Sequence, residues 1–184
     1  HDARCVARLA ARLRRLHELE PPEGARRLEY STLIADYRRS LAARPEPRTR
    51  SSGALDGGAD RRLLSAGATA RVQALCHNDV HHRNVIEGES LWLIDWEYAA
   101  VGDPLYDLAA FACYHDLDAI ERIGLLEAYA PGAAPALTSS FDEHCWLFDY
   151  LHLLWLELTA ADVADCQRLM QRLTKKRGQI YFHG

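Results

Sequence analysis

The sequence predicts a mainly helical α+β fold with one small β-hairpin near its middle. Apolar residues recur at helical spacing along most of the 184 residues. Two short β-type runs, 85–86 and 91–94, flank a turn-like Glu87-Gly88-Glu89-Ser90, which predicts the hairpin. Hydrophobic residues make up 48% of the chain and charged residues 26%, so a single domain or lobe with a buried core is expected.

Helices are expected on both sides of the hairpin. Val6, Leu9, Leu13 and Leu16 recur at helical spacing with arginines between them, which predicts an amphipathic helix with a basic, solvated face. An anion-binding face is the alternative for the four arginines: Arg4, Arg8, Arg12 and Arg15. Further helices are predicted at 28–41, 61–71, 107–115, 117–130, 141–164 and 167–177. The stretch 43–60 is rich in Pro, Gly and Ser, which predicts a flexible loop.

Charge and cysteine usage exclude several classes of protein. The net charge of −4 argues against a general nucleic-acid binder, which usually carries a basic face. The five cysteines form no C-x-x-C pair, so reduced thiols in a cytoplasmic protein are expected. Charges interrupt every apolar stretch well before about 18 residues, so no membrane span is expected.

One set of polar residues in a fixed order indicates a catalytic site. His77 and Asp79 form an H-x-D motif, Asn84 follows after four residues, and Asp95 comes directly after the predicted hairpin. Phosphoryl transfer needs a carboxylate that takes a proton from the attacking hydroxyl, and Asp79 is the predicted base. Magnesium needs hard oxygen ligands, and Asn84 and Asp95 are predicted to hold it with the nucleotide phosphates. His77 is expected to brace the catalytic loop. Zinc bound by His77, His81 and His82 with Asp79 is a weaker alternative, because the segment is predicted to be a loop and no H-E-x-x-H frame is present.

These motifs resemble the aminoglycoside phosphotransferase and choline kinase superfamily, in particular its choline, ethanolamine and thiamine kinase-like branch. The carriers are H-N-D-V-H-H-R-N at 77–84, I-D-W-E-Y at 94–98 and G-D-P-L-Y-D-L-A at 102–109. Protein kinases place an H-R-D-x-x-x-x-N loop and a D-F-G segment in the same order. The resemblance implies that 1–184 is the C-terminal lobe of a protein-kinase-like fold, with the hairpin carrying the site. It also implies ATP as co-substrate, Mg²⁺ as the ion and a small-molecule alcohol as acceptor.

The resemblance also implies a supporting role for one residue and the absence of one lobe. Asp107 resembles the helix-start residue that supports the catalytic loop. The family's N-terminal lobe, with its five-stranded sheet and phosphate-contacting lysine, is expected to be absent. The two lysines of the chain, Lys175 and Lys176, both lie at its far end. Low activity of this chain by itself is therefore expected.

Substrate contacts are predicted from acidic and aromatic residues. Glu97 follows the metal aspartate and suits a cationic alcohol, a plain surface residue being the alternative. Cation–π attraction would let at least one aromatic residue of 141–164 contribute to a substrate pocket, although core packing is the better explanation for any single one of them. These aromatic residues are Trp146, Tyr150 and Trp155. Two other functions stay open: phosphorylation of an aminoglycoside or other metabolite, and a non-catalytic kinase-like binding module.

Overall fold

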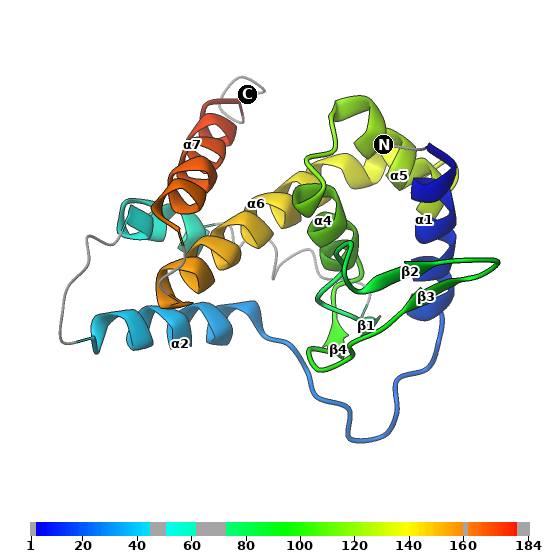
Figure 1. The fold of residues 1–184 in the computed structure, drawn as a ribbon, viewed down its shortest axis with the longest axis horizontal. Helices are drawn as coiled ribbons and strands as arrows, with labels where there is room; N and C mark the ends of the chain where they lie inside the picture. Colours follow the sequence, from blue (N-terminus) through cyan, green and yellow to red (C-terminus); the bar gives the residue numbers. More distant parts are fainter. Residues whose placement is uncertain (1–2, 45–50, 62–72, 160–161, 180–184) are drawn as a thin grey trace. The chain divides into compact units, whose positions relative to one another are not determined.

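The computed structural model describes residues 3–44, 51–61, 73–159 and 162–179. It divides into two compact units, which are drawn together in Figure 1. The first unit comprises residues 1–28 and 69–145, and the second comprises residues 29–68 and 146–184. Both units are mainly helical, which confirms the predicted fold class.

The first unit is built on the amphipathic helix that the sequence predicts. Helix α1 (Ala3–His17) packs against α5 (Ala119–Tyr129), and Figure 1 shows the two side by side. Leu9 and Leu13 of α1 are buried, as are Leu125 and Leu126 of α5. The apolar stripe that repeats at helical spacing therefore forms the contact between the two helices.

Helix α4 (Leu105–Tyr114) is the most deeply buried helix of the first unit. Every residue from Leu105 to Cys113 is buried, so this helix has no polar outer face. The following helix, α5, begins with a reciprocal cap. The Asp118 carboxylate accepts hydrogen bonds from the Ile120 and Glu121 amides, and the Glu121 carboxylate accepts one from the Asp118 amide.

Two antiparallel strand pairs lie in the first unit. Strand β2 (Val85–Glu87) pairs with β3 (Leu91–Leu93) in the register Val85 to Leu93, which confirms the predicted hairpin. Strand β1 (Ala74–Cys76) pairs with β4 (Ala100–Gly102), which brings together the two ends of the segment that contains the catalytic motifs. The second pair was not predicted, because each strand has only three residues and the partners are far apart in sequence.

The basic face of α1 holds the hairpin. Arg8 pairs with the Glu87 carboxylate at 2.5 Å and donates to the Gly88 carbonyl at 3.0 Å. Arg12 donates from Nε to the Leu91 carbonyl at 2.8 Å, and its guanidinium carbon lies 5.9 Å from the centroid of the Trp92 ring. The prediction of a solvated basic face is therefore wrong for Arg8 and Arg12. Helical periodicity could not reveal their partners, which lie 79 to 80 residues away.

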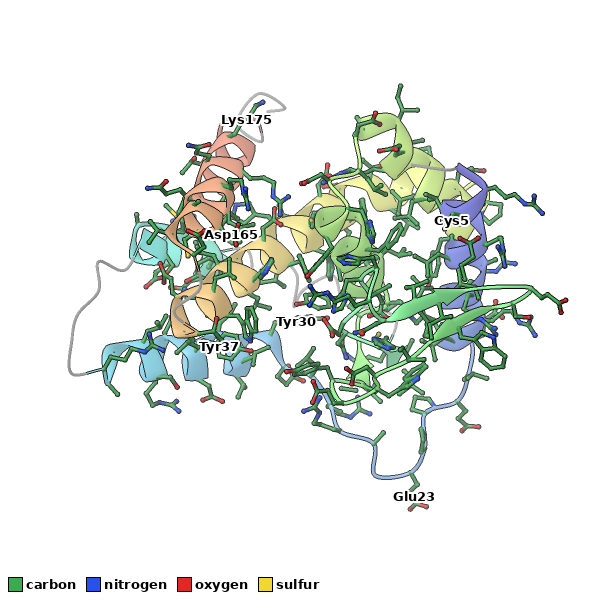
Figure 2. The ribbon with its side chains drawn as sticks, in the orientation of Figure 1. Cys5, Glu23, Tyr30, Tyr37, Asp165 and Lys175 are labelled. Atoms are coloured by element: carbon green, nitrogen blue, oxygen red, sulfur yellow. The ribbon has the colours of Figure 1, made fainter. Side chains whose placement is uncertain are left out.

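The second unit contains α2 (Tyr30–Ala42), the 3-10 turn η1 (Ser51–Leu55), the later part of α6 (Ala134–Thr159) and α7 (Val163–Gln179). Figure 2 shows Tyr30 and Tyr37 on α2, and Asp165 and Lys175 on α7. At 26 residues α6 is the longest of the described helices, but none of these is apolar enough over its length to cross a membrane.

Part of the predicted loop 43–60 is helical. Residues 51–55 form η1, and residues 56–61 continue as helix. The Glu157 carboxylate accepts hydrogen bonds from the Ser52 amide at 3.0 Å and the Ser52 hydroxyl at 2.6 Å. This distant partner offsets the low helix propensity of the Gly- and Ser-rich segment. Apart from Arg61, the predicted helix 61–71 lies outside the described residues.

A buried histidine of the first unit is expected to make stability depend on pH. His144 on α6 donates from Nδ1 to the Ser140 carbonyl at 2.7 Å, and its Nε2 lies 3.4 Å from an Asp103 carboxylate oxygen. Burial alone lowers the pKa of His144, but the interactions with Asp103 outweigh it, so the pKa is raised. The charged form is therefore favoured by folding, and its contribution is complete below the ordinary histidine pKa of about 6.5.

That contribution should disappear as the pH rises through the raised pKa of folded His144. Urea unfolding of the wild type and His144→Gln at several pH values between about 5.5 and 8.5 measures it. The difference in unfolding free energy between the two proteins should shrink steadily as the pH rises. A difference that stays constant over this range would show that His144 is not stabilised as the charged form.

Candidate active site

The predicted catalytic loop begins where strand β1 ends, and a buried histidine connects it to the hairpin. His77 is fully buried, and its Nε2 donates to the Ile94 carbonyl at 2.9 Å. Its ring also lies 4.7 Å, centroid to centroid, from the Trp96 indole. A carbonyl can only accept, so Nε2 carries a proton. His77 thus fixes the start of the loop to the segment that carries Asp95.

A buried carboxylate at the start of α4 holds the backbone of the same loop. Asp107 accepts hydrogen bonds from the His77 amide at 2.8 Å and from the Asn78 amide at 2.7 Å. Its side chain is completely buried, so these donors replace the water that would otherwise solvate the charge. Asn78 has a φ of 65°, a left-handed conformation that asparagine tolerates better than most residues.

Two further residues extend this network, and the sequence analysis missed both. His17, the last residue of α1, places Nε2 3.0 Å from Asp107 Oδ2, while its Nδ1 lies 2.8 Å from the Tyr129 hydroxyl. His17 and Asp107 are 90 residues apart in the sequence. No local pattern identifies such a pair, since a histidine at the end of an amphipathic helix is ordinarily a surface residue.

Asp79 and Asn84 form a direct contact within the loop. The Asn84 side-chain amide donates to Asp79 Oδ2 at 2.7 Å and to the Asp79 backbone carbonyl at 3.0 Å. Asn84 is buried, whereas the Asp79 side chain keeps 32% of its surface exposed. The carboxylate is therefore held through one oxygen while it stays accessible to a ligand.

The hairpin brings Asp95 to the same end as Asn84. The Ile94 amide donates to the Asn84 carbonyl at 3.0 Å, which continues the β2–β3 ladder by one step. Asp95 follows directly, is exposed and has a φ of 64°. This left-handed turn ends the ladder, and it is the kind of unusual backbone that often marks functional positions.

The oxygen atoms of Asn84 and Asp95 fit a magnesium ion. The Asn84 amide nitrogen is occupied by Asp79, so its Oδ1 is the atom left for a cation. Within the described part of the chain, the Asp95 carboxylate has no hydrogen-bond or ion-pair partner. One neutral and one anionic oxygen donor suit Mg²⁺, which takes few protein ligands and fills its shell with phosphate and water.

A separate, largely buried group of three potential metal ligands is unsuited to a metal. Ligand atoms of His17, Cys76 and Asp107 lie within 4.8 Å of one another. Burial, together with the charges of Asp107 and Asp103, raises the pKa of the Cys76 thiol far above its usual value. A metal ion binds the deprotonated thiolate, so a thiol that stays protonated is a poor ligand. The Asp107 oxygens are also occupied, because they accept hydrogen bonds from two backbone amides.

The acidic character of the site extends to Glu97 and Tyr98. Both side chains are exposed, and the sequence analysis identified only Glu97. Partial burial raises the pKa of the Tyr98 phenol, and the negative charges of Glu97, Asp79 and Asp95 raise it further. The Tyr98 phenol therefore interacts electrostatically with all three carboxylates. Its aromatic ring lies in a negative potential beside the predicted catalytic loop.

The predicted aromatic substrate residues belong to the second unit. Trp146 and Tyr150 are buried and stack with a centroid separation of 5.3 Å. The Trp146 indole N–H points to the Leu173 carbonyl at 3.4 Å, and the Tyr150 hydroxyl donates to Asp56 at 2.6 Å. Trp155 is exposed. Core packing thus accounts for Trp146 and Tyr150, while a substrate role for the three aromatic residues stays a prediction.

Comparison with known proteins identifies the family. Residues 1–143 match the sequence model of APH, the phosphotransferase enzyme family. The chain belongs to this family. A stretch of 55 residues is 38% identical to protein LicA of Haemophilus influenzae and spans 29% of this chain and 21% of that protein.

Several solved structures have a similar fold, and their names give different substrates. A choline/ethanolamine kinase family protein from Mesorhizobium loti matches with a TM-score of 0.81 at 24% identity, over 94% of this chain and 62% of the other. Choline kinase LicA from Streptococcus pneumoniae gives 0.81 at 20% identity, over 96% and 64%. The GDP complex of aminoglycoside 2'-phosphotransferase-IIIa gives 0.63 at 17% identity, over 96% and 62%. The chain therefore spans less than two thirds of each of these three solved chains.

Proposed function

We propose that the protein containing this chain transfers the γ-phosphoryl group of ATP to the hydroxyl of a small cationic alcohol. The observation that supports this most strongly is the arrangement of Asp79, Asn84 and Asp95. The partly exposed Asp79 carboxylate is held by the Asn84 amide on the loop. Asn84 in turn pairs with Ile94, the residue before Asp95, whose carboxylate has no partner among the described residues. Membership of the phosphotransferase family supports the same chemistry.

Asp79 acts as the base in this proposal. The substrate hydroxyl donates its proton to the carboxylate while its oxygen attacks the γ-phosphorus. A new O–P bond forms, the bond from the γ-phosphorus to the bridging oxygen breaks, and ADP leaves with that oxygen. Because Asn84 occupies Oδ2 of Asp79, the other carboxylate oxygen, Oδ1, receives the proton.

Asn84 and Asp95 would hold Mg²⁺, and the ion would supply positive charge for the nucleotide phosphates. When bound, Mg²⁺ neutralises phosphate charge that would otherwise repel the attacking oxygen. The role of the protein residues is positional. The Ile94–Asn84 backbone hydrogen bond keeps the two ligands at one end of the hairpin, and His77 ties that end to the catalytic loop.

The surroundings of Asp79 favour a cationic substrate. Glu97 supplies a negative charge, and the exposed rings of Trp96 and Tyr98 offer aromatic faces to a quaternary or protonated amine. Each cation–π contact contributes about 0.5–2 kcal/mol. Choline, ethanolamine and thiamine fit this description, and two of the similar structures carry choline or ethanolamine kinase in their names.

An aminoglycoside is the second candidate substrate. It also carries positive charges, and an aminoglycoside phosphotransferase shares the fold with a lower TM-score. The carboxylates of Asp79, Asp95 and Glu97 would attract either ligand. A third possibility, a non-catalytic module, is disfavoured because the residues proposed as base and metal ligands, Asp79, Asn84 and Asp95, are all present.

The decisive experiment measures ADP release by the full-length protein with Mg²⁺, ATP and each alcohol in turn: choline, ethanolamine, thiamine and kanamycin. We expect turnover with one of the first three. Glu97→Gln should then raise the KM for that substrate about three- to tenfold, because one partly solvated attractive charge is lost.

Two controls make this test specific to charge. Glu89→Gln removes a carboxylate from the exposed hairpin turn and should leave the KM unchanged. The uncharged tert-butyl analogue of choline should bind wild type and Glu97→Gln equally. Turnover of kanamycin alone would move the assignment to the second candidate, and turnover of none of the four would contradict the cationic-alcohol proposal.

A further inference from the structure

A second histidine of the loop, His81, lies close to the predicted base Asp79. It follows Asp79 by two residues, whereas His77 precedes it by two. His81 Nε2 lies 3.3 Å from Asp79 Oδ2. The other ring nitrogen, Nδ1, accepts a hydrogen bond from the Arg83 backbone amide at 3.1 Å. An amide N–H can only donate, so Nδ1 must present its lone pair. The single proton of a neutral imidazole is therefore on Nε2, the atom nearest the carboxylate.

The His81 ring is held in place by packing as well. It stacks on the Tyr114 ring with a centroid separation of 4.8 Å and an interplanar angle of 26°. Only 15% of the His81 side chain is exposed. Tyr114 is the last residue of α4, the helix whose first turn carries Asp107. One helix thus supports the catalytic loop at two places, through Asp107 at its start and Tyr114 at its end.

We propose that His81 is a positioning residue that orients the Asp79 carboxylate for proton transfer. This inference rests on the proposed function, in which Asp79 is the base. His81 and Asn84 both place N–H groups near Oδ2 of Asp79. Asn84 donates a hydrogen bond to Oδ2, and the His81 N–H group 3.3 Å away adds positive charge density beside the same oxygen. Oδ1 lies next to neither group, so it is the more basic oxygen. The two neighbours together select which oxygen faces the substrate hydroxyl.

The adjacent histidine provides a matched control. His82 is exposed, and its ring lies 5.7 Å from the Tyr114 ring and 6.0 Å from the His115 ring, centroid to centroid. Among the described residues, no contact joins the His82 side chain to Asp79. Substitution of His82 therefore removes an imidazole from the same loop without removing the N–H group that lies beside the carboxylate.

The kinetic test compares three variants of the full-length protein. His81→Leu should lower kcat about 10- to 100-fold, the loss expected when a reacting group is misplaced, with the KM for alcohol and ATP changed less than about twofold. His81→Gln should restore most of kcat, because its amide N–H reaches the position of Nε2. His82→Leu should keep the wild-type kcat. Equal losses in the two leucine variants, or no rescue by glutamine, would overturn the proposal.

A second measurement does not require turnover, so it separates this inference from the proposed function. Long-range proton–nitrogen NMR spectra of histidine-labelled protein at about pH 8, above the usual histidine range, report which ring nitrogen carries the proton. We expect the Nε2–H tautomer for His81, with an Nε2 shift that changes in Asp79→Asn. The Nδ1–H tautomer, or no change in that variant, would contradict the positioning role. Absence of turnover in the wild type would instead count against the proposed phosphotransfer.

Discussion

Asp79→Asn should lower kcat by about 10²- to 10⁴-fold, the usual contribution of a general base. Asparagine has nearly the same shape as aspartate, so the loop should keep its course. The Asp79 backbone carbonyl still accepts from Asn84, and Asp107 still holds the two preceding amides. The variant loses only the group that can take the proton from the substrate hydroxyl.

Binding measurements separate this chemical defect from a structural one. Calorimetry should show that Asp79→Asn binds ADP with the same dependence on Mg²⁺ as the wild type. Asp95→Asn should lose that dependence, because the anionic metal ligand is gone. Asparagine also suits the φ of 64° at this position, so the backbone should be preserved. If Asp79→Asn kept wild-type turnover, the assignment of the base would be wrong.

Asp107→Ala should reduce the unfolding free energy by about 3–5 kcal/mol. The carboxylate is completely buried and accepts from the His77 amide, the Asn78 amide and His17 Nε2. Alanine would leave these donors in an apolar interior without an acceptor. The expected loss is a large part of the stability of an ordinary domain. Urea unfolding followed by circular dichroism measures it.

An exposed aspartate is the appropriate comparison. Asp36 on α2 forms one ion pair with Arg39 at 2.8 Å, three residues along the same helix. Asp36→Ala should change the unfolding free energy by less than about 0.5 kcal/mol, as is usual for surface pairs. A loss of similar size in the two variants would show that burial of the Asp107 network contributes little.

The sequence predicted the parts of the site that lie close together along the chain. The spacing of Asp79, Asn84 and Asp95 indicated a loop followed by a hairpin, and the β2–β3 pair confirms that hairpin. Helical periodicity located most of the helices to within a few residues. These features depend on local propensity and on the period of apolar residues, both of which a single sequence displays.

Contacts between distant segments could not be predicted in the same way. Two hydrogen bonds join residues about 80 to 90 positions apart: His17 to Asp107, and Arg12 to the Leu91 carbonyl. Helical periodicity showed only which face of α1 is polar, so the arginines were interpreted as solvated. Tyr98 was missed because its electrostatic surroundings arise from three carboxylates that only the folded loop brings near.

The contacts of Arg8 and Arg12 with the hairpin affect the order in which parts of the protein fold during synthesis. An isolated two-stranded hairpin is marginally stable in water, and here each strand has only three residues. Helix α1 leaves the ribosome well before the hairpin that it will hold. The end of the hairpin that carries Asp95 should therefore form late, after a long loop has closed. A nascent chain released before Leu91 would carry the predicted catalytic loop without a rigid hairpin beside it.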